Sequence, residues 1–374
     1  MSYDFVFIGA GLANLSLLYR MQASEYFKSK SIAIVEPDSK TKNDRTWCFW
    51  STQNPIYEKA VQKQWSEMSF KRNDQRWTQN INPYQYYYIQ GSDFYQEVIS
   101  SIKVDLNIDW YRTSVKDVSL RSNNNTLYLE SGEELIGHYV FNSSWQHSGN
   151  TMDRAGMKQH FFGIKLKLKE NNLSFDSVHL MDFSFNTDKQ SVQFGYILPI
   201  NGNEALIEYT EFSKFIKSKS EYLQILNTYL KNLGISDYEL IDQEFGVIPM
   251  SKNHFNDRRS DYFINTGTVG GLTKPTTGYT FQFVQKDSEL IINCLKEKRV
   301  IPVRGRGSRF KFYDSLLLSI VEKEPWTVGP IMQKLFSRNK FIKILKFLDE
   351  ESSLMEEIRI FVSLPWKPFL KQLI

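Results

Sequence analysis

Two glycines and a carboxylate near the start of the chain have the types and spacing that hold a dinucleotide. Gly9 and Gly11 follow an apolar, strand-like stretch and open a predicted helix, and Glu36 ends the next apolar stretch. Gly9 permits a tight turn, Gly11 lets backbone N–H groups approach a pyrophosphate at the helix N-terminus, and Glu36 can hold a ribose hydroxyl. Asn14 replaces the usual third glycine, one residue after Ala13. We predict cofactor binding by Gly9, Gly11, Ala13 and Glu36; the alternative is an ordinary strand–turn–helix unit with a surface glutamate.

A second glycine-rich turn follows an apolar stretch near residue 265. The strand-like "YFINTG" (262–267) runs into "GGLTKPTTGYTFQF" (270–283), in which Gly267 and Gly278 are predicted to present backbone N–H groups and a helix dipole to a cofactor. NAD and FAD both fit the first motif. Chains that wrap an FAD often close its site with such a late strand–turn–helix, so position favours FAD. Many flavin hydroxylases carry a Gly-Asp pair here, whereas this strand ends in Thr266-Gly267-Thr268.

Two acids in apolar surroundings are candidates for proton transfer. Glu208, in "LIEYT", alternates with apolar residues on a predicted strand. It either points inward or is a surface glutamate on an edge strand. Glu211 has the opposite parity and is expected to face solvent. Asp182, in "LMDF", is a second buried acid or a structural hydrogen-bonding residue. Burial raises the pKa of a carboxyl group and keeps it protonated, which is what protonating a very weak base requires.

These residues require an α/β fold with two sheets. A strand–helix–strand start predicts a Rossmann-type FAD-binding domain, and alternating stretches between residues 151 and 239 predict an inserted antiparallel sheet. From residue 310 the pattern is helical. We expect an α+β two-domain flavoprotein: residues 1–50, 86–150 and 240–300 as FAD-binding domain, 51–85 and 151–239 as substrate domain, and 301–374 as C-terminal helical region.

Composition limits the other classes. Aromatic residues make up 15% of the 374 residues, which favours either a strand-rich aromatic core or a pocket for a large unsaturated ligand. A net charge of +4 without a domain-wide basic stripe argues against nucleic acid, and two cysteines with five scattered histidines predict no disulfide framework and no metal site. We expect no signal peptide, and no apolar run is long enough to span a bilayer. A cytoplasmic protein is predicted.

Four stretches taken together resemble the flavin-dependent lycopene cyclases. They are "GAGLAN" (9–14), "DRTWCFW" (44–50), "LPINGNEALIEYT" (198–210) and "GVIPM…GTVGGLTKPTTGY" (246–279), and the C-terminal "FLDEESSLMEEIRIFVSLPWKPFL" (347–370) is similar to bacterial members. Arg45, Trp50 and Lys274 stand where several members have histidines, which bears on product specificity more than on reaction class.

The resemblance implies an FAD enzyme that closes the ψ ends of linear lycopene into rings without net redox change. The flavin would act in its reduced form, with NAD(P)H as the priming reductant. Glu208 matches the family's catalytic acid. Ring faces that could stabilise a cation are expected from Trp47, Phe49, Trp50, Tyr279 and Phe281, with Asp182 as the second acid of the pocket. Lys274 either lies near the flavin or is solvated, and Cys48 has no adjacent histidine to activate it.

Lycopene dissolves in bilayers, so the enzyme is expected to bind the membrane peripherally. "IMQKLFSRNKFIKILKFL" (331–348) mixes basic and apolar residues as an interfacial helix does, and Trp366 and Phe369 could add a second contact. The alternative is an amphipathic helix packed on the body. β-Rings are the expected product, but γ or ε rings, closure of one end, the exact carotene and the oligomeric state stay open. The rival functions are an FAD-dependent monooxygenase or reductase acting on an isoprenoid lipid, and a non-catalytic carotenoid or flavin carrier.

Overall fold

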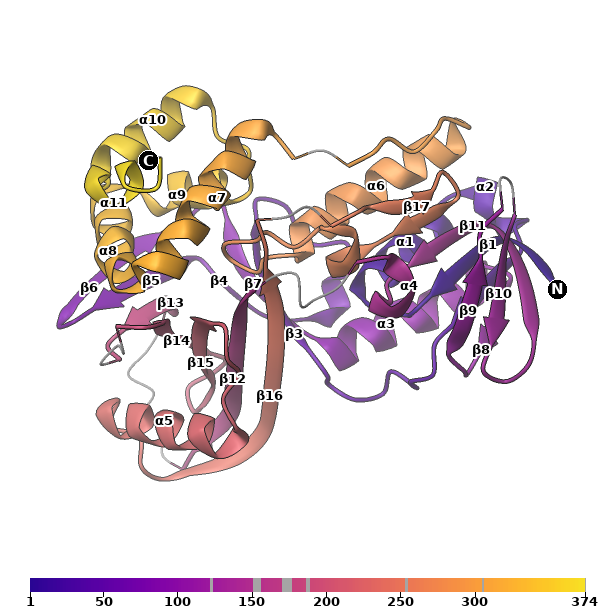
Figure 1. Cartoon of the computed structure of the whole chain (residues 1–374). Coiled ribbons are helices and arrows are strands. Elements are labelled where there is room, and N and C mark those ends of the chain that lie inside the picture. The colour runs from indigo at the N-terminus through magenta and orange to yellow at the C-terminus, as the bar shows by residue number, and fades with distance from the viewer. Residues whose placement is uncertain are drawn as a thin grey trace.

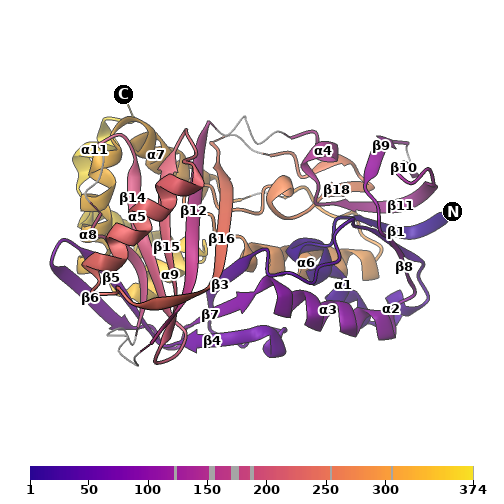
Figure 2. The same cartoon turned by 90° about the horizontal axis from the view of Figure 1, so that it is seen from below.

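The computed structural model describes residues 1–121, 124–150, 156–169, 177–185, 189–252, 255–304 and 306–373. Within these residues the strands form three sheets, of eight, seven and three strands. The two large sheets lie at opposite ends of the molecule and the three-stranded sheet lies between them (Figure 1, Figure 2).

The eight-stranded sheet holds both glycine-rich turns. Its main path is β17–β18–β11–β1–β2–β8, parallel except for β17, and a β9–β10 hairpin is joined to β11. The strands are β1 (Ser2–Ile8), β2 (Ile32–Val35), β8 (Ile108–Tyr111), β9 (Val115–Ser119), β10 (Asn125–Leu129), β11 (Glu134–Asn142), β17 (Arg258–Ser260) and β18 (Phe263–Asn265). Parallel strands covered on both faces read as continuous apolar runs, which is how β1 and β2 read here.

Helices pack against one face of this sheet. The aromatic side chains of Phe5 and Phe7 on β1 share a buried core with α1 (Leu12–Gln22), α3 (Gly91–Asp105) and α6 (Phe281–Lys296). Two short helices, α2 (Glu25–Lys28) and α4 (Trp145–Ser148), and the 3₁₀ turns η1 (Glu58–Ala60) and η3 (Gly267–Gly270) complete this part.

The seven-stranded sheet is antiparallel apart from one parallel pair, β5 with β13. Its order is β16–β12–β15–β14–β13–β5–β6. The bounds are β5 (Glu67–Arg72), β6 (Gln75–Asn80), β12 (Met157–Leu168), β13 (Val178–Phe183), β14 (Val192–Pro199), β15 (Glu204–Ser213) and β16 (Tyr238–Met250). Alternate side chains of these strands face α5 (Lys219–Asn232) on one side and the C-terminal helices on the other (Figure 2).

The small sheet and the C-terminal helices close the structure. The small sheet has the order β3–β7–β4, formed by β3 (Thr46–Ser51), β4 (Val61–Trp65) and β7 (Gln85–Gln90). The helices are α7 (Ser308–Lys323), η4 (Pro325–Thr327), α8 (Val328–Arg338), α9 (Phe341–Leu348), α10 (Leu354–Ser363) and α11 (Trp366–Leu370), the orange-to-yellow group of Figure 1. None of the helices in the described ranges has the length and apolar content to cross a bilayer.

Two of the predicted domain boundaries do not coincide with the ends of sheets. The predicted boundary at residue 239 falls inside β16, which stays in the antiparallel sheet as far as Met250. Segment 51–85 is divided, because β5 and β6 extend the antiparallel sheet whereas β4 pairs with β7 in the small sheet.

Asn14 ties the first glycine turn to the late one. Its side-chain amide donates to the carbonyl oxygens of Ile8 (3.0 Å), Gly9 (2.8 Å) and Phe141 (3.2 Å). Its Oδ1 accepts a 2.8 Å hydrogen bond from the hydroxyl of Thr266. The side chain is fully buried. A glycine here would give close helix–strand packing, but the asparagine adds hydrogen bonds between three segments that lie far apart in the sequence.

We expect Asn14→Ala to destabilise the protein by about 2–4 kcal/mol, because several buried polar groups lose their partner at once. Urea unfolding measures this loss. Asn232→Ala, at an exposed position near the end of α5, is the matched control and should stay within about 0.5 kcal/mol of the parent. An unchanged midpoint in the Asn14 variant would contradict this role.

Candidate active site

The first glycine turn has the shape that a pyrophosphate requires. Gly9 adopts φ +88°, and a Cβ at this residue would collide with the hydroxyl of Ser143. Around Gly11, the N-cap of α1, no described atom lies within 4 Å of a Cβ position. The helix therefore presents its first N–H groups to open space, which is the arrangement that binds a phosphate.

Glu36 is buried at the end of β2, beside this turn. Its Oε2 accepts a 2.7 Å hydrogen bond from the backbone N–H of Ala10, and its Oε1 accepts one of 3.0 Å from Asp38. Each carboxylate oxygen keeps a second lone pair, so Glu36 can still accept a ribose hydroxyl. These residues fit the adenine-side half of a dinucleotide.

The late turn reaches both the first turn and the antiparallel sheet. Gly267, at φ +60°, approaches Ala13 so closely that an added Cβ would lie 3.2 Å from the Ala13 Cβ. Gly278, at φ +74°, leaves no room for a side chain, because a Cβ would lie 2.7 Å from Oε1 of Gln159 on β12 and 2.9 Å from Ile248 on β16. The loop between the two glycines thus carries Tyr279 from the cofactor end onto the antiparallel sheet.

Glu208 lies in a row of three residues across the antiparallel sheet. Gly163 on β12 is the register partner of Glu208 on β15 and of Glu244 on β16. Leu206 and Phe212 share the parity of Glu208 and belong to the core under the C-terminal helices, so the acid points to that face. Both glutamates are partly buried and lie on either side of a glycine that has no side chain.

The two acids have perturbed pKa values. Burial raises the pKa of Glu208 well above its ordinary value, and the neighbouring charge of Glu244 raises it further. Burial raises the pKa of Glu244 to about 7, although a hydrogen bond from the Thr46 hydroxyl opposes the shift. Both shifts favour the protonated form of the carboxyl group, and at Glu208 burial and the charge of Glu244 act in the same direction.

Tyr196 and Tyr279 lie next to Glu208, and Tyr86 and Trp50 pack on Tyr279. Tyr279 is hydrogen-bonded to Tyr86 of β7 and Tyr196 of β14, the register partner of Glu208. Trp50 of β3 packs edge-on against Tyr279, with ring centroids 4.6 Å apart. Burial raises the pKa of all three tyrosines, so they remain neutral donors. Cys48 is equally buried and its pKa is raised, so its thiol is not a nucleophile.

The chain matches the sequence profile of the lycopene cyclase protein family over residues 4–374. This chain belongs to the lycopene cyclase family. It is 23% identical over 286 residues to the lycopene beta-cyclase of Pantoea ananas, a match that covers 74% of this chain and 71% of that protein.

Solved flavoproteins share the fold. The geranylgeranyl bacteriochlorophyll reductase-like protein of Thermoplasma acidophilum has a TM-score of 0.62 at 10% identity, covering 100% of this chain and 98% of that one. A halogenase in complex with FAD has a TM-score of 0.56 at 9% identity, covering 93% of this chain and 79% of that one. The predicted fold class, a Rossmann-type flavoprotein with an antiparallel sheet and C-terminal helices, is confirmed.

Of the aromatics predicted for the pocket of this cyclase-family chain, the structure brings two to Glu208. Tyr279 interacts with Glu208 directly and Trp50 packs against Tyr279, whereas Trp47, Phe49 and Phe281 pack in the core beneath α1, α3 and α6. Phe49 and Phe281 stack on each other with centroids 3.8 Å apart. Side chains alternate along β3, so Trp47 and Phe49 must point away from the face that Trp50 occupies.

Asp182 and Glu211 lie on the opposite face of the sheet, against α5. Asp182 is fully buried, accepts a 2.8 Å hydrogen bond from Tyr229 and pairs with Lys71 at 3.6 Å, so the structure does not bring it to Glu208. The expectation that Glu211 faces solvent is wrong. It is 2% exposed and is held by Tyr209 and Lys217, because α5 covers the face that parity assigns to it.

Lys274 is buried, so the alternative of a solvated lysine is wrong. Its ammonium lies 2.9 Å from Glu350 and 3.4 Å from Asp314, both of which also pair with Arg306. Thr276 donates a 2.7 Å hydrogen bond to the same Asp314. The late turn is therefore joined to the C-terminal helices by two cations and two anions.

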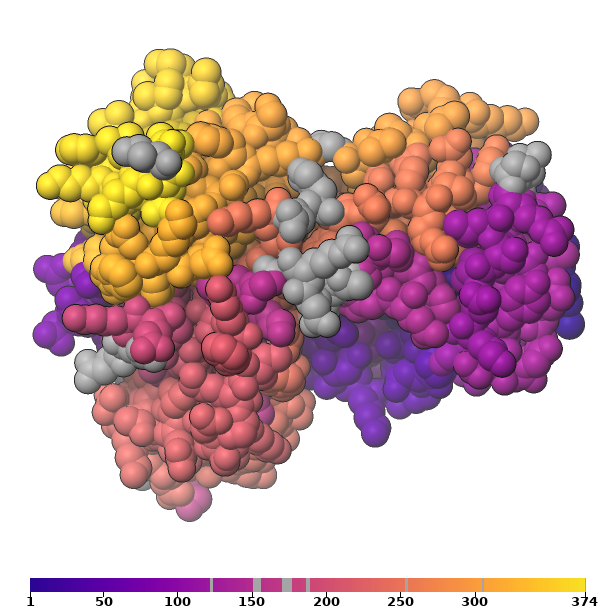
Figure 3. All heavy atoms as spheres, viewed as in Figure 1, coloured from indigo at the N-terminus to yellow at the C-terminus, as the bar shows by residue number. Residues whose placement is uncertain are grey.

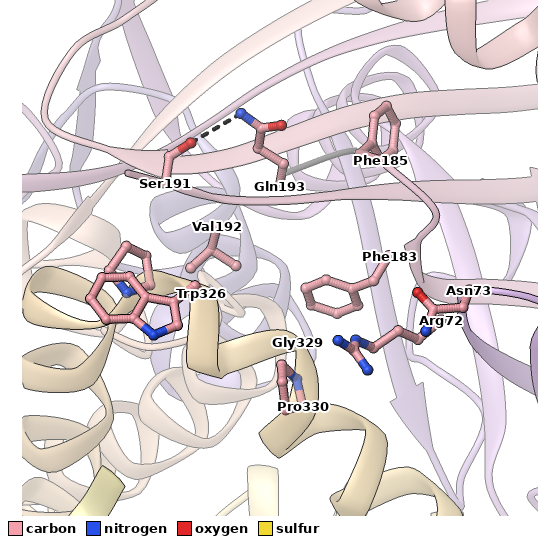
Figure 4. A pocket seen from close by; sticks show the side chains of 11 residues that line it. Arg72, Asn73, Phe183, Phe185, Ser191, Val192, Gln193, Trp326, Gly329 and Pro330 are labelled. Atoms are coloured by element: carbon pink, nitrogen blue, oxygen red, sulfur yellow. Dashed lines mark hydrogen bonds between the residues drawn. The ribbon is translucent and has the colours of Figure 1, made fainter. Parts of the chain in front are cut away.

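A cavity of about 380 Å³ opens elsewhere on the same side of the sheet (Figure 4). Phe183, Val192 and Trp326 are among its lining residues, and neither acid of the row is. Val192 and Tyr196 share a face of β14 four residues apart, about 13 Å along the strand. The buried ring of Phe194 lies between them on that face.

Sequence reasoning missed Glu244, Tyr86 and Tyr196. The three-strand register that places Glu244 two strands from Glu208 has no local signal, although Glu244 comes two residues before the quoted "GVIPM" stretch. In "YYY" (86–88) a period of two could have shown that Tyr86 and Tyr88 share a face.

We expect Lys274→Met to lower the free energy of unfolding by about 3 kcal/mol, because it leaves an uncompensated negative charge in a buried cluster. Urea unfolding of this variant should be compared with Lys296→Met at an exposed site of α6. Adding Glu350→Gln to Lys274→Met restores the charge balance and should recover part of the loss. Equal stability of the Lys274→Met and Lys296→Met variants would contradict the pairing.

Proposed function

We propose that this chain is an FAD-dependent lycopene cyclase that converts ψ ends to β-ionone rings, towards β-carotene. The observation that carries the proposal is a carboxylic acid, Glu208, held protonated among aromatic rings where the late glycine turn meets the antiparallel sheet. Membership of the family and the flavoprotein fold support the reaction class.

The reaction needs one strong acid and a dry site. Glu208 delivers its proton to the terminal double bond, leaving a tertiary cation. The next double bond attacks this cation and closes the ring, and loss of a ring proton forms the new double bond. One proton is gained and one is lost, so the formula and the oxidation level do not change. Burial disfavours the charged form of the carboxyl group, so the proton needed for the first step stays on Glu208 until the substrate is bound.

Aromatic side chains stabilise the cation and exclude water. Trp50 and Tyr279 present ring faces and edges next to Glu208, and each desolvated cation–π contact contributes on the order of 2 kcal/mol. The hydroxyl groups of Tyr86 and Tyr196 hold the Tyr279 ring in place.

Gly9, Gly11, Ala13, Glu36, Gly267 and Gly278 would hold the FAD. When bound in its reduced form, FAD would supply negative charge close to the cation. NAD(P)H would then reduce the flavin once and would not be consumed with each ring.

We expect Glu208→Gln to abolish ring formation and to leave FAD bound, because the amide cannot donate an acidic proton. Chromatography of pigments from a lycopene-accumulating bacterial host, with and without this chain, measures the product. The control is Glu204→Gln, at the beginning of the same strand. Rings formed at the parental rate by the Glu208 variant would remove this residue from its role, and an inert substitution with bound pigment would favour a carrier.

The second candidate is an FAD-dependent monooxygenase or reductase acting on an isoprenoid lipid. The likeness to a geranylgeranyl bacteriochlorophyll reductase-like protein favours it. Consumption of NAD(P)H in proportion to product distinguishes it from the cyclase, for which ring formation should exceed NAD(P)H oxidation many-fold.

We propose that a membrane-dissolved substrate is reached through α10 and α11 and not through residues 331–348. Along α8 and α9 the apolar side chains Ile331, Leu335 and Ile344 are buried, and Lys343 and Lys346 both pair with Glu356.

Exposed apolar residues lie on α10 and α11. This segment is in the yellow region at one end of the molecule (Figure 3). Met355, Ile358 and Val362 fall on one side of α10, and Val362 is 80% exposed. Trp366 follows on α11, and Arg359 and Lys367 are exposed beside them. Apolar residues with an interfacial tryptophan and basic neighbours suit an anionic bilayer surface, so we propose peripheral binding on the cytoplasmic leaflet through this face.

We expect Val362→Glu to reduce binding to anionic phospholipid vesicles at least fivefold in co-sedimentation, because it places a charge at the acyl boundary. Val104→Glu, an equally exposed valine at the end of α3, is the control. Equal loss in both variants, or none in either, would rule out this face.

A further inference from the structure

We propose that Glu208 and Glu244 act as a pair that holds one proton across Gly163, with Glu244 as the positioning residue that keeps this proton on Glu208. The inference rests on the proposed function and adds a second acid to its site.

The sheet register makes the pair. Gly163 lies between the two glutamates on the central strand of three, and the strands are about 4.8 Å apart. A Cβ on Gly163 would lie 2.7 Å from Cγ of Glu208 and 3.0 Å from Cγ of Glu244. Both side chains therefore occupy the space that the glycine leaves, and the charge of Glu244 acts on Glu208 across it. Any other residue at 163 would separate them.

Glu244 has one carboxylate oxygen available for an interaction with Glu208. One carboxylate oxygen accepts from the hydroxyl of Thr46 on β3. The other, Oε1, is buried without a hydrogen-bond partner among the described residues, and it lies 3.4 Å from the Cβ position of Gly163. Leaving a buried carboxylate oxygen without a hydrogen-bond partner destabilises the folded state, and a shared proton removes that penalty.

Two carboxyl groups this close cannot both be ionised without a large repulsion, so they titrate as a pair. Thr46 donates to Glu244 alone, which stabilises the negative charge there and leaves the proton on Glu208. Because only Glu244 accepts this hydrogen bond, Glu208 is the acid of the pair and Glu244 is the carboxylate.

Asp242 raises the pKa of Glu244, and the other titratable groups at the pair are a thiol and phenols. Those whose charge is coupled to one or other acid are Cys48 on β3, Tyr88 on β7, Tyr196 on β14, Tyr279 in the late turn and Asp242 on β16. Burial holds the thiol and the phenols in their protonated forms, so Glu244 is the near charge that Glu208 senses.

The charge on Glu244 sets the direction in which the pH dependence of ring formation shifts. The charge on Glu244 raises the pKa of Glu208, so Glu208 keeps its proton to a higher pH. Ring formation is lost as the pH rises through the pKa of Glu208 in the folded protein. Removing the charge lowers that pKa and moves the alkaline limb of the rate profile to lower pH.

The test uses purified protein with reduced FAD and lycopene in phospholipid vesicles, with initial rates of ring formation measured across pH. Glu244→Gln should shift the alkaline limb down by about one pH unit or more while the rate at acid pH is retained. Thr46→Val, which removes the hydroxyl that favours charge on Glu244, should give a smaller shift in the same direction. Glu239→Gln, exposed on the same strand, should leave the profile unchanged.

A second measurement does not depend on activity. Infrared difference spectra should contain a protonated carboxyl band that is absent from Glu208→Gln and that titrates at lower pH in Glu244→Gln. A Glu244 variant that is slower at every pH, with an unmoved limb and an unmoved band, would overturn the pair and reduce Glu244 to a structural residue. If this variant does not fold, Thr46→Val decides by the same criteria. If the parent protein forms no rings but the band shifts as expected, the proposed function fails and the pair stands.

Discussion

Placing Glu208 where burial raises its pKa is the constraint on which the rest of this structure depends. A glutamate in water is ionised, and only removal from water raises its pKa enough to reverse this. Glu208 stands on the face of the antiparallel sheet that is shared with the small sheet, the late turn and the C-terminal helices. Tyr196 of the antiparallel sheet and Tyr279 of the late turn are neutral groups next to it, and Trp50 of the small sheet packs on Tyr279. Opening any one of these parts would admit water and lower the pKa of the acid.

The C-terminal helices close the site through three successive acids. Asp349 accepts a 2.6 Å hydrogen bond from the indole of Trp50, Glu350 pairs with Lys274 in the late turn, and Glu351 pairs with Lys286 on α6. Burial raises the pKa of Asp349 to about 7. The turn between α9 and α10 therefore connects the small sheet, the late turn and α6. Although this turn is far from Glu208 in the sequence, it helps to keep the surroundings of Glu208 closed.

The two glycine turns solve a related problem at the cofactor end. Gly267 contacts Ala13, and Thr266 is hydrogen-bonded to Asn14, so segments from the two ends of the fold form one cradle. The same loop then places Gly278 against β12 and β16 and Tyr279 beside Glu208. Cofactor end and acid are linked by some ten residues of backbone. A shift of the loop at Gly267 would also displace Tyr279, because both glycines pack closely against neighbouring elements.

Local sequence determined the parts of this protein whose signal is local. The first strand–turn–helix, Glu36, the late turn, α5 and the parity of Glu208 follow from glycine spacing and from apolar periodicity, since those patterns reflect backbone geometry over a few residues. Tertiary structure alone decided which residues meet. Trp47, Phe49 and Asp182 lie on other faces than Glu208. Glu211 is buried under α5, and Lys274 is buried against acids of the C-terminal helices. Apolar side chains are exposed on α10, whereas those of Ile331, Leu335 and Ile344 are buried. Tertiary structure also placed Glu244 beside Glu208, because the register of three strands depends on pairing between segments far apart in the chain, and pairing of that kind has no counterpart in a local pattern.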